Sequence, residues 1–313
     1  MRKPFVAVIG AGQVGATTAQ RILEKGIADV VLFDVVEGMP QGKALDLMEA
    51  APLEGHDRRI VGTNDYKDIT GAEIVVVTAG LPRKPGMSRE DLLAMNAKII
   101  REVCAQIKSH APDSKLIIVT NPLDIMTYLA FKVTGFPKER VIGMAGVLDT
   151  ARMRFFIAER LSAVPKDVEA VVLGGHGDLM VPVSSHTRVQ NQPVKDLVPA
   201  ADLAQIEQRT RDGGAEVVAL LKTGSAFYAP ASSVTEMVRA ILKDEKKILP
   251  VCAYLSGEYG VRDIYFGVPA ALGKKGIEKV IEISLTADEK KSLLASAEKV
   301  KQGVAELERL NLL

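Results

Sequence analysis

Residues 5–15 read FVAVIGAGQVG, an apolar run that leads directly into a glycine-rich turn. A helical pattern follows this turn and ends near Gly26, and a second apolar run, residues 30–33, ends at Asp34. A strand, a GxGxxG turn, a helix and a strand closed by an acidic residue are together the parts of a dinucleotide-binding βαβ unit. The sequence therefore predicts an N-terminal, Rossmann-type, doubly wound parallel sheet.

The residues of this turn have separable physical roles. Gly10 permits the tight turn, Gly12 lets the main chain approach a pyrophosphate, and Gly15 lets the helix pack closely on the sheet. The first turn of the helix offers unpaired N–H groups to phosphate oxygens. We therefore predict cofactor contacts from the whole turn, namely Gly10, Ala11, Gly12, Gln13, Val14 and Gly15.

Asp34 separates the two nicotinamide cofactors. Its carboxylate is placed to accept hydrogen bonds from the hydroxyls of the adenosine ribose and to repel a 2′-phosphate. The sequence therefore predicts NAD rather than NADP. The alternative is a glycine turn that only packs, with Asp34 as a cap.

Two further apolar runs, residues 74–78 and 116–120, are typical of parallel strands that are covered on both faces. Asn121 follows the second run, and the carboxyl ends of such strands border the ligand crevice of a doubly wound sheet. Asn121 is therefore a candidate contact for the substrate or the nicotinamide ribose. Its alternative role is that of a turn residue before Pro122.

Residues 81–91 read LPRKPGMSRED and concentrate three cations between two strands of the predicted sheet. Prolines and a glycine break regular structure here, and residues 88–91 are typical of a capping box that opens a helix. A cationic loop at the carboxyl end of a strand predicts a mobile lid over an anionic substrate. The alternative is a solvated basic loop.

Residues 173–178 read LGGHGD and follow the apolar run 168–173, which predicts a buried strand. His176 is a side chain that exchanges protons near neutral pH, although a single histidine at a strand end is commonly structural. Asp149 and Arg152 lie three residues apart on a helix predicted from about residue 145. They form either a local ion pair, or a pair in which Asp149 orients His176 and Arg152 grips a carboxylate.

The second half of the chain predicts an α+β domain rather than more parallel sheet. We place the boundary between residues 1–144, which bind the cofactor, and residues 145–313, which form the catalytic substrate domain. The predicted strands cover residues 180–185, 189–194, 248–254 and 263–268. The predicted helices cover residues 201–221, with an interruption at Gly213 and Gly214, residues 232–242, and residues 286–310.

Composition excludes several functional classes. The 313 residues carry a formal net charge of +1, which gives no general attraction to nucleic acid or acidic membranes. No apolar run reaches the roughly 18 residues that suggest a membrane span. Cys104 and Cys252 lie in apolar segments, which favours free thiols and a cytoplasmic location. His56, His110 and His186 do not form a set with metal-ligand spacing, so we expect no metal.

Together these stretches resemble the lactate/malate dehydrogenase family, and within it the malate dehydrogenases closest to lactate dehydrogenases. The resemblance runs in order through GAGQVG, Asp34, VVVTAGLPRKPGMSREDLL, IIVTNPLD, GVLDTARMR and LGGHGDLMVP, and covers essentially the whole chain. It implies an NAD-dependent oxidoreductase of the tricarboxylic acid cycle that reversibly oxidises (S)-malate to oxaloacetate. It also implies a homodimer or homotetramer with a small dicarboxylate as its substrate.

The resemblance further implies a division of labour among the site residues. His176 accepts a proton when the hydroxy acid is oxidised and donates it in the reverse direction, and Asp149 holds the required imidazole tautomer. Arg152 binds the carboxylate beside the reacting carbon, and Arg89 polarises the carbonyl. The remaining implied contacts are Asn121 with substrate and cofactor, and Asn96 and Val119 with the cofactor.

Arg83 carries the choice of substrate. At the matching loop position malate dehydrogenases have arginine and lactate dehydrogenases typically have glutamine. An arginine under a closed lid is paired by the second carboxylate of malate and left unpaired by lactate, which costs several kcal/mol where water is excluded. Two alternatives stay open: a lactate or broad 2-hydroxyacid dehydrogenase, and an NAD-binding sensor that has lost catalysis.

Overall fold

The computed structural model describes residues 4–82 and 88–313. Its first half is a parallel sheet whose strand order is β3-β2-β1-β4-β5-β6. This order confirms the predicted doubly wound fold. In such a fold the ligand crevice opens at the switch point between β1 and β4, because strands are added in one direction from β1 to β3 and in the other from β4 to β6. The strands are β1 (Phe5–Ile9), β2 (Asp29–Phe33), β3 (Ile60–Thr63), β4 (Ile74–Val77), β5 (Lys115–Ile118) and β6 (Val141–Gly143).

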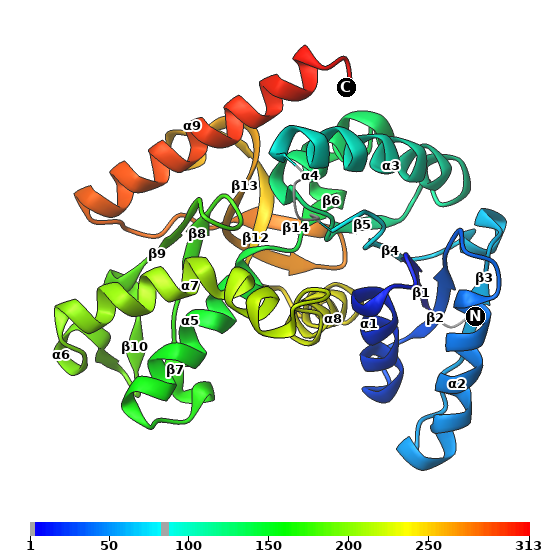
Figure 1. Cartoon of the computed structure of the whole chain (residues 1–313), viewed down its shortest axis with the longest axis horizontal. Helices are drawn as coiled ribbons and strands as arrows, with labels where there is room; N and C mark the ends of the chain where they lie inside the picture. The colour runs from blue at the N-terminus through cyan, green and yellow to red at the C-terminus, as the bar shows by residue number, and fades with distance from the viewer. Residues whose placement is uncertain (1–3, 83–87) are drawn as a thin grey trace.

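Helices cover both faces of these strands (Figure 1), which is why β1 and β4 are apolar and buried along their whole length. Figure 1 shows α1 (Gln13–Glu24) and α2 (Met39–Glu54) on one side, with α3 (Arg89–His110) and α4 (Leu123–Thr134) on the other. Ala19, Ile22 and Leu23 of α1 are buried as its helical spacing predicts. The sequence analysis did not predict α2, α4, β3 or β6.

Antiparallel strands of the second half extend the same sheet rather than forming a separate one. β6 pairs with β12 through Gly143 and Cys252, and the order continues β12-β13-β8-β9 with β14 beside β13. The antiparallel pairing agrees with the predicted α+β character. These strands are β8 (Val172–Gly174), β9 (Met180–Pro182), β12 (Lys247–Ser256), β13 (Arg262–Gly273) and β14 (Gly276–Val280), and only β14 was not predicted.

Three predicted strands need correction, and two of them contribute to a small second sheet of β7 (Val168–Glu169), β10 (Arg188–Val189) and β11 (Gln192–Pro193). The apolar run 168–173 is two strands in different sheets, β7 and β8. The run 189–194 is a hairpin, because Gln190 and Asn191 turn the chain with φ of 47° and 69°. The strand predicted for 180–185 ends at Pro182, and a 3₁₀ turn follows at Ser184–His186. Apolar content alone did not locate these turns.

The predicted interruption of a helix at Gly213 and Gly214 is wrong, because α7 (Ala200–Leu221) continues through both glycines. The role of Gly213 is to leave space for a neighbouring side chain. A Cβ atom at Gly213 would lie 3.0 Å from Cδ of Arg152, so the missing side chain lets α7 approach that arginine. Glycine lowers helix stability by roughly 1 kcal/mol relative to alanine. At residue 213 it also lets α7 lie close to the Arg152 side chain.

The remaining helices pack around the second half. α5 (Gly146–Leu161) agrees with the prediction, and α8 (Tyr228–Leu242) begins four residues before the predicted start at residue 232. The capping box of Thr286 and Glu289 starts α9 (Ala287–Arg309), which Figure 1 shows alongside α4. The short helical segments are α6 (Val194–Leu197), η1 (Tyr66–Ile69), η2 (Lys138–Arg140), η3 (Pro165–Asp167), η4 (Ser184–His186) and η5 (Glu258–Gly260).

The larger hydrophobic core is shared by the two halves of the chain. It joins strands β1, β4 and β5 to side chains of α8, β13 and α9, while a smaller core lies among α5, α7 and β7. Within residues 4–82 and 88–313, no helix combines the length and the apolar character needed to cross a bilayer.

Candidate active site and cofactor site

The glycine turn after β1 forms a tight cradle at the start of α1. Gly10 adopts a φ of +108°, and its N–H donates to the carbonyl oxygen of Phe33 at 2.8 Å. A Cβ atom at Gly15 would collide with the carbonyl oxygen of Gly10, so only glycine lets α1 sit this close to β1. A Cβ atom at Gly12 would have no other atom within 4 Å, so the space beside this residue is open. Gly12 is the N-cap of α1, and no side chain caps the helix there. This leaves helix N–H groups available to phosphate oxygens.

Asp34 closes this cradle from the end of β2. Its Oδ2 accepts the N–H of Ala11 at 2.7 Å, and its Oδ1 accepts the N–H of Val36 at 3.0 Å. Lys43 of α2 donates to the carbonyl oxygen of Ala11 at 2.6 Å. Asp34 is therefore a cap for the turn, and each carboxylate oxygen keeps lone pairs that ribose hydroxyls can use. The two alternatives for Asp34 are thus compatible.

A pocket of ≈ 380 Å³ extends from the glycine turn along β2 and β4. Besides Gly10, Gly12 and Asp34, it is lined by Tyr66, Ile99 and Glu102, which the sequence analysis did not single out. The ring of Tyr66 stacks at 4.0 Å on Phe33, and burial, as the largest cause, raises the pKa of Tyr66 to about 12. These residues come from η1 and α3, and no local motif marked them.

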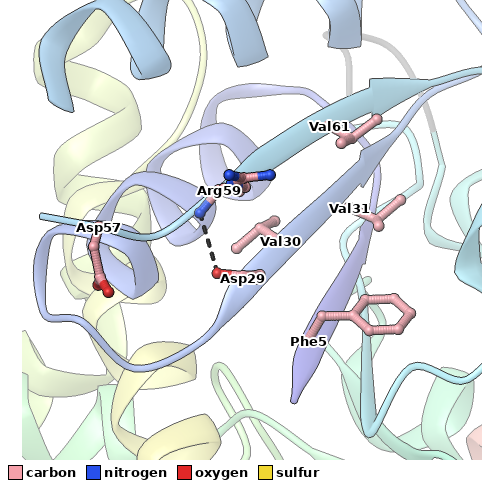
Figure 2. A pocket seen from close by; sticks show the side chains of 7 residues that line it. All are labelled: Phe5, Asp29, Val30, Val31, Asp57, Arg59 and Val61. Atoms are coloured by element: carbon pink, nitrogen blue, oxygen red, sulfur yellow. Dashed lines mark hydrogen bonds between the residues drawn. The ribbon is translucent and has the colours of Figure 1, made fainter. Parts of the chain in front are cut away.

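A different pocket lies at the opposite ends of the same strands (Figure 2). There the N–H of Arg59 donates to Oδ1 of Asp29 at 3.1 Å. Because Asp29 begins β2 whereas Asp34 follows it, this pocket is separated from the glycine turn by the length of the strand. It is not part of the cofactor site. Its lining is Phe5, Asp29, Val30, Val31, Asp57, Arg59 and Val61.

His176 lies in the turn between β8 and β9. Gly174 and Gly177 adopt φ values of +89° and +87°, which L side chains rarely tolerate. Ser296 of α9 fixes the turn because its Oγ accepts the N–H of Gly175 at 3.0 Å and donates to the carbonyl oxygen of Leu179 at 2.7 Å. The glycines thus shape the turn, and the last helix of the chain holds it in place.

Asp149 of α5 joins the two other predicted groups. Its Oδ2 lies 2.9 Å from Nδ1 of His176, and its Oδ1 lies 3.5 Å from Nη1 of Arg152. The Asp149 side chain is 3% exposed, whereas His176 and Arg152 are each 15% exposed. The buried carboxylate of Asp149 therefore holds the side chains of both His176 and Arg152. The local ion pair and the orienting contact therefore occur together.

The electrostatic environment favours a protonated His176. Burial by itself lowers the pKa of the imidazole, but the charge and hydrogen bond of Asp149 and the charge of Asp124 raise it above its ordinary value. Arg152 acts in the opposite direction. The outcome is a histidine whose pKa is raised above its ordinary value.

Asp124, at the start of α4, is a site residue that the sequence analysis overlooked. Its Oδ2 accepts the main-chain N–H of His176 at 2.8 Å, and its Oδ1 accepts the thiol of Cys252 at 3.2 Å. The only local signal was an acid three residues after Asn121 in the stretch TNPLD. Nothing in the sequence indicated its partners, which are 52 and 128 residues away.

The other predicted site residues are placed as follows. Asn121 is exposed at the end of β5, where its peptide bond to Pro122 is cis. Asn96 is 1% exposed and its amide holds the main chain of Leu81 and Asn121, with bonds of 2.8 Å and 2.7 Å. It therefore braces two loops of the crevice. Val119 is partly buried and continues β5.

The structure does not describe the side chains of two arginines that were predicted to bind the substrate. Residues 83–87 of the predicted lid, Arg83 among them, lie outside the described residues, as does the side chain of Arg89. The predicted capping box is confirmed, because Ser88 Oγ accepts the N–H of Asp91 at 3.0 Å and Asp91 accepts the N–H of Ser88 at 3.1 Å. The main chain of Arg89 begins α3.

An open pocket of ≈ 930 Å³ lies where these elements meet. His176, Asn121 and Asp124 line it together with residues of α3 and α9. This volume is within the range of small-molecule sites, about 300–1,000 Å³. In the part of the chain that the structure describes, no group of three or more His, Cys, Asp or Glu residues is arranged to hold a metal ion.

Comparison with known proteins yields two family models that together span the chain. The NAD-binding domain of lactate/malate dehydrogenases matches residues 5–143, and the alpha/beta C-terminal domain matches residues 146–310. A malate dehydrogenase of Trichormus variabilis is 55% identical over 303 residues, covering 97% of this chain and 94% of the relative. One of Desulforudis audaxviator is 56% identical over 289 residues, covering 92% of this chain and 94% of the relative.

Solved structures agree over the same length. Malate dehydrogenase of Salinibacter ruber superposes with a TM-score of 0.94 at 49% identity, covering 98% of each chain. A lactate dehydrogenase of Cryptosporidium parvum, solved with lactic acid and nicotinamide adenine dinucleotide, gives 0.95 at 42% identity, covering 98% of this chain and 99% of that one. The sequence, the fold and the site geometry lead to one conclusion: the chain belongs to the lactate/malate dehydrogenase family.

Proposed function

We propose that this chain is an NAD-dependent malate dehydrogenase that interconverts (S)-malate and oxaloacetate. The observation that carries this proposal is the His176–Asp149–Arg152 group, which lies in one turn and one helix beside the crevice of a dinucleotide-binding sheet. Relatives above 50% identity that are named malate dehydrogenase support the same activity.

The cradle at the start of α1 fits NAD. Its open space at Gly12, the unpaired N–H groups of α1 and the acid at Asp34 suit pyrophosphate and ribose hydroxyls respectively. NAD held there would supply the hydride-transfer chemistry that interconverts malate and oxaloacetate. We assign to the cofactor site Asn96, Val119 and Asn121 in addition to residues 10–15 and Asp34.

His176 performs the proton transfer in this proposal. Asp149 accepts Nδ1–H, which leaves Nε2 free to take the hydroxyl proton of malate. The imidazolium that forms is stabilised by the same carboxylate. Arg152 binds the carboxylate next to the reacting carbon, Asn121 contacts the substrate oxygen, and Arg89 stabilises negative charge on that oxygen.

Arg83 gives the preference for a dicarboxylate, because it pairs with the second carboxylate of oxaloacetate. The first measurement is the ratio of kcat/KM for oxaloacetate and pyruvate with NADH in one buffer. We expect a ratio above about 10³, since a site that loses a designed polar partner discriminates strongly. A ratio near one would replace this proposal by a broad 2-hydroxyacid dehydrogenase, and NADH binding without turnover of either acid would replace it by a sensor.

We expect Asp34→Ser to raise KM for NAD about 10- to 100-fold and to raise the relative use of NADP. The reason is that loss of a charged hydrogen-bond acceptor is costly and the repulsion of a 2′-phosphate disappears. The measurement is kcat/KM with each cofactor. Thermal unfolding is the control, because Ala11 N–H also loses its acceptor. An unchanged NAD-to-NADP ratio in a folded variant would remove Asp34 from the ribose site.

Three further assignments accompany the proposal. The boundary between the cofactor half and the substrate half lies at residues 144–145, and the change of family model between residues 143 and 146 supports it. The enzyme is a homodimer or homotetramer in the cytoplasm. Exposed apolar side chains support assembly, among them Leu45, Leu53 and Leu220, which are 62%, 89% and 76% exposed. Buried free thiols at Cys104 and Cys252 support a reducing compartment.

A further inference from the structure

We infer that Asp124 is a positioning residue for proton transfer: its carboxylate fixes the main chain of His176 from the cofactor half of the molecule. Asp149 holds the imidazole ring of His176, whereas Asp124 holds its N–H. The histidine is thereby fixed at both its side chain and its main chain. This inference rests on the proposed function, in which His176 exchanges the proton.

The geometry around Asp124 is that of a bound carboxylate. The residue is 5% exposed and lies in the first turn of α4, where helix N–H groups stabilise negative charge. One oxygen accepts the N–H of His176 at 2.8 Å and the other accepts the thiol of Cys252 at 3.2 Å. The pKa of Asp124 is raised above its ordinary value, because burial outweighs the opposing effects of these hydrogen bonds and of the His176 charge. Each oxygen therefore has a partner, as a buried charge requires.

The placement of Asp124 links three segments that are far apart in the sequence. α4 follows Asn121 and the end of β5, Cys252 lies on β12 where that strand meets β6, and His176 lies after β8. Asp124 therefore couples the loop that carries Asn121 to the turn that carries His176. This buried side chain therefore helps to set the spacing between these two groups across the pocket, and small displacements of reacting groups are costly, about 10²-fold per 1 Å.

Asp124 also contributes charge. Around His176 the charged groups are Asp149, Asp124 and Arg152, and the two carboxylates raise the pKa of the imidazole while Arg152 lowers it. Removing the charge at Asp124 therefore lowers the pKa of His176. A side chain that only filled space would have no such effect, so the titration of His176 separates a positioning role from a structural one.

The test compares Asp124→Asn with Ser296→Ala. Asparagine keeps the shape but removes the charge, and its neutral amide oxygen is a weaker acceptor for the N–H of His176 than a carboxylate is. Ser296→Ala removes a neutral hydrogen bond from the neighbouring Gly175. We expect Asp124→Asn to lower kcat for malate about 10- to 100-fold with little change in KM. We expect it to shift the NMR titration of the His176 imidazole to lower pH, and Ser296→Ala to leave that titration unchanged.

The NMR titration needs no substrate, so it tests Asp124 separately from the proposed function. The chain has four histidines, and a His176→Gln sample assigns the signal. An unchanged titration and unchanged kcat in folded Asp124→Asn overturn the inference. If that variant does not fold, Asp124→Ser decides, since serine is favourable near a helix start but removes the carboxylate that accepts the N–H of His176. A lowered kcat at constant KM then supports the inference, and a wild-type kcat overturns it.

Discussion

We expect His176→Gln to lower kcat for malate oxidation about 10³- to 10⁴-fold, which is near the upper end of what positioned acid–base groups contribute. Glutamine can still form hydrogen bonds but has no group that takes up a proton near neutral pH. Because the glycine cradle at α1 is untouched, NADH binding should stay near the wild-type level. The measurement is steady-state kinetics together with nicotinamide fluorescence.

The pH dependence provides the companion measurement. Oxidation needs neutral imidazole, so kcat/KM for malate falls as the pH drops through the pKa of His176. Reduction of oxaloacetate needs the imidazolium and falls as the pH rises through the same value. Since Asp149 and Asp124 raise this pKa against the effects of burial and Arg152, Asp149→Asn should move both limbs to lower pH. Limbs that stay in place would contradict the role given to Asp149, and a His176→Gln enzyme with more than a tenth of wild-type kcat would contradict the role of His176.

The second large effect is expected for Arg83→Gln, which should reduce the preference for oxaloacetate over pyruvate about 10⁴-fold. Its physical reason is charge pairing: the dicarboxylate loses its partner, and pyruvate no longer leaves an arginine unpaired. The measurement is kcat/KM for both acids in wild type and variant. Lys84→Gln is the matched control, because it removes a neighbouring charge from the same loop and should change the ratio only a few-fold.

Equal losses on both acids would contradict the assignment of Arg83. They would mean that the arginine supports the loop rather than the second carboxylate. A similar change in the Lys84→Gln control would point instead to the total charge of the loop, which salt screens. Repeating the comparison at high ionic strength separates these two causes.

Local patterns predicted the parts of the molecule that local physics determines. β1, the glycine turn and α1 follow directly from an apolar run, three glycines and a helical period. The capping boxes at Ser88 and Thr286 behave in the same way, although only the first was predicted. The catalytic assignments for His176 and Asp149 came mainly from the family resemblance, and the 2.9 Å contact between them agrees with that assignment.

Long-range packing explains most of what the sequence did not predict. Asp124 looked like an ordinary helix-opening acid, and only the fold brings His176 and Cys252 to it. Gly213 and Gly214 were interpreted as a helix break, because the space that Gly213 leaves for Arg152 depends on a residue in another helix. The run 168–173 was divided because its ends pair with different strands, β10 and β13, which pattern alone does not reveal.

The pairing of β6 with β12 has a consequence for how the molecule can be divided. The boundary that we propose at residues 144–145 divides two proposed roles, yet the sheet and the larger core cross it. A fragment of residues 145–313 would present β12 as an unprotected edge strand. Apolar side chains that pack against the first half would become exposed beside it, and such an arrangement is prone to aggregation. Because one sheet and one core span both halves, we expect neither half to be stable when it is expressed alone.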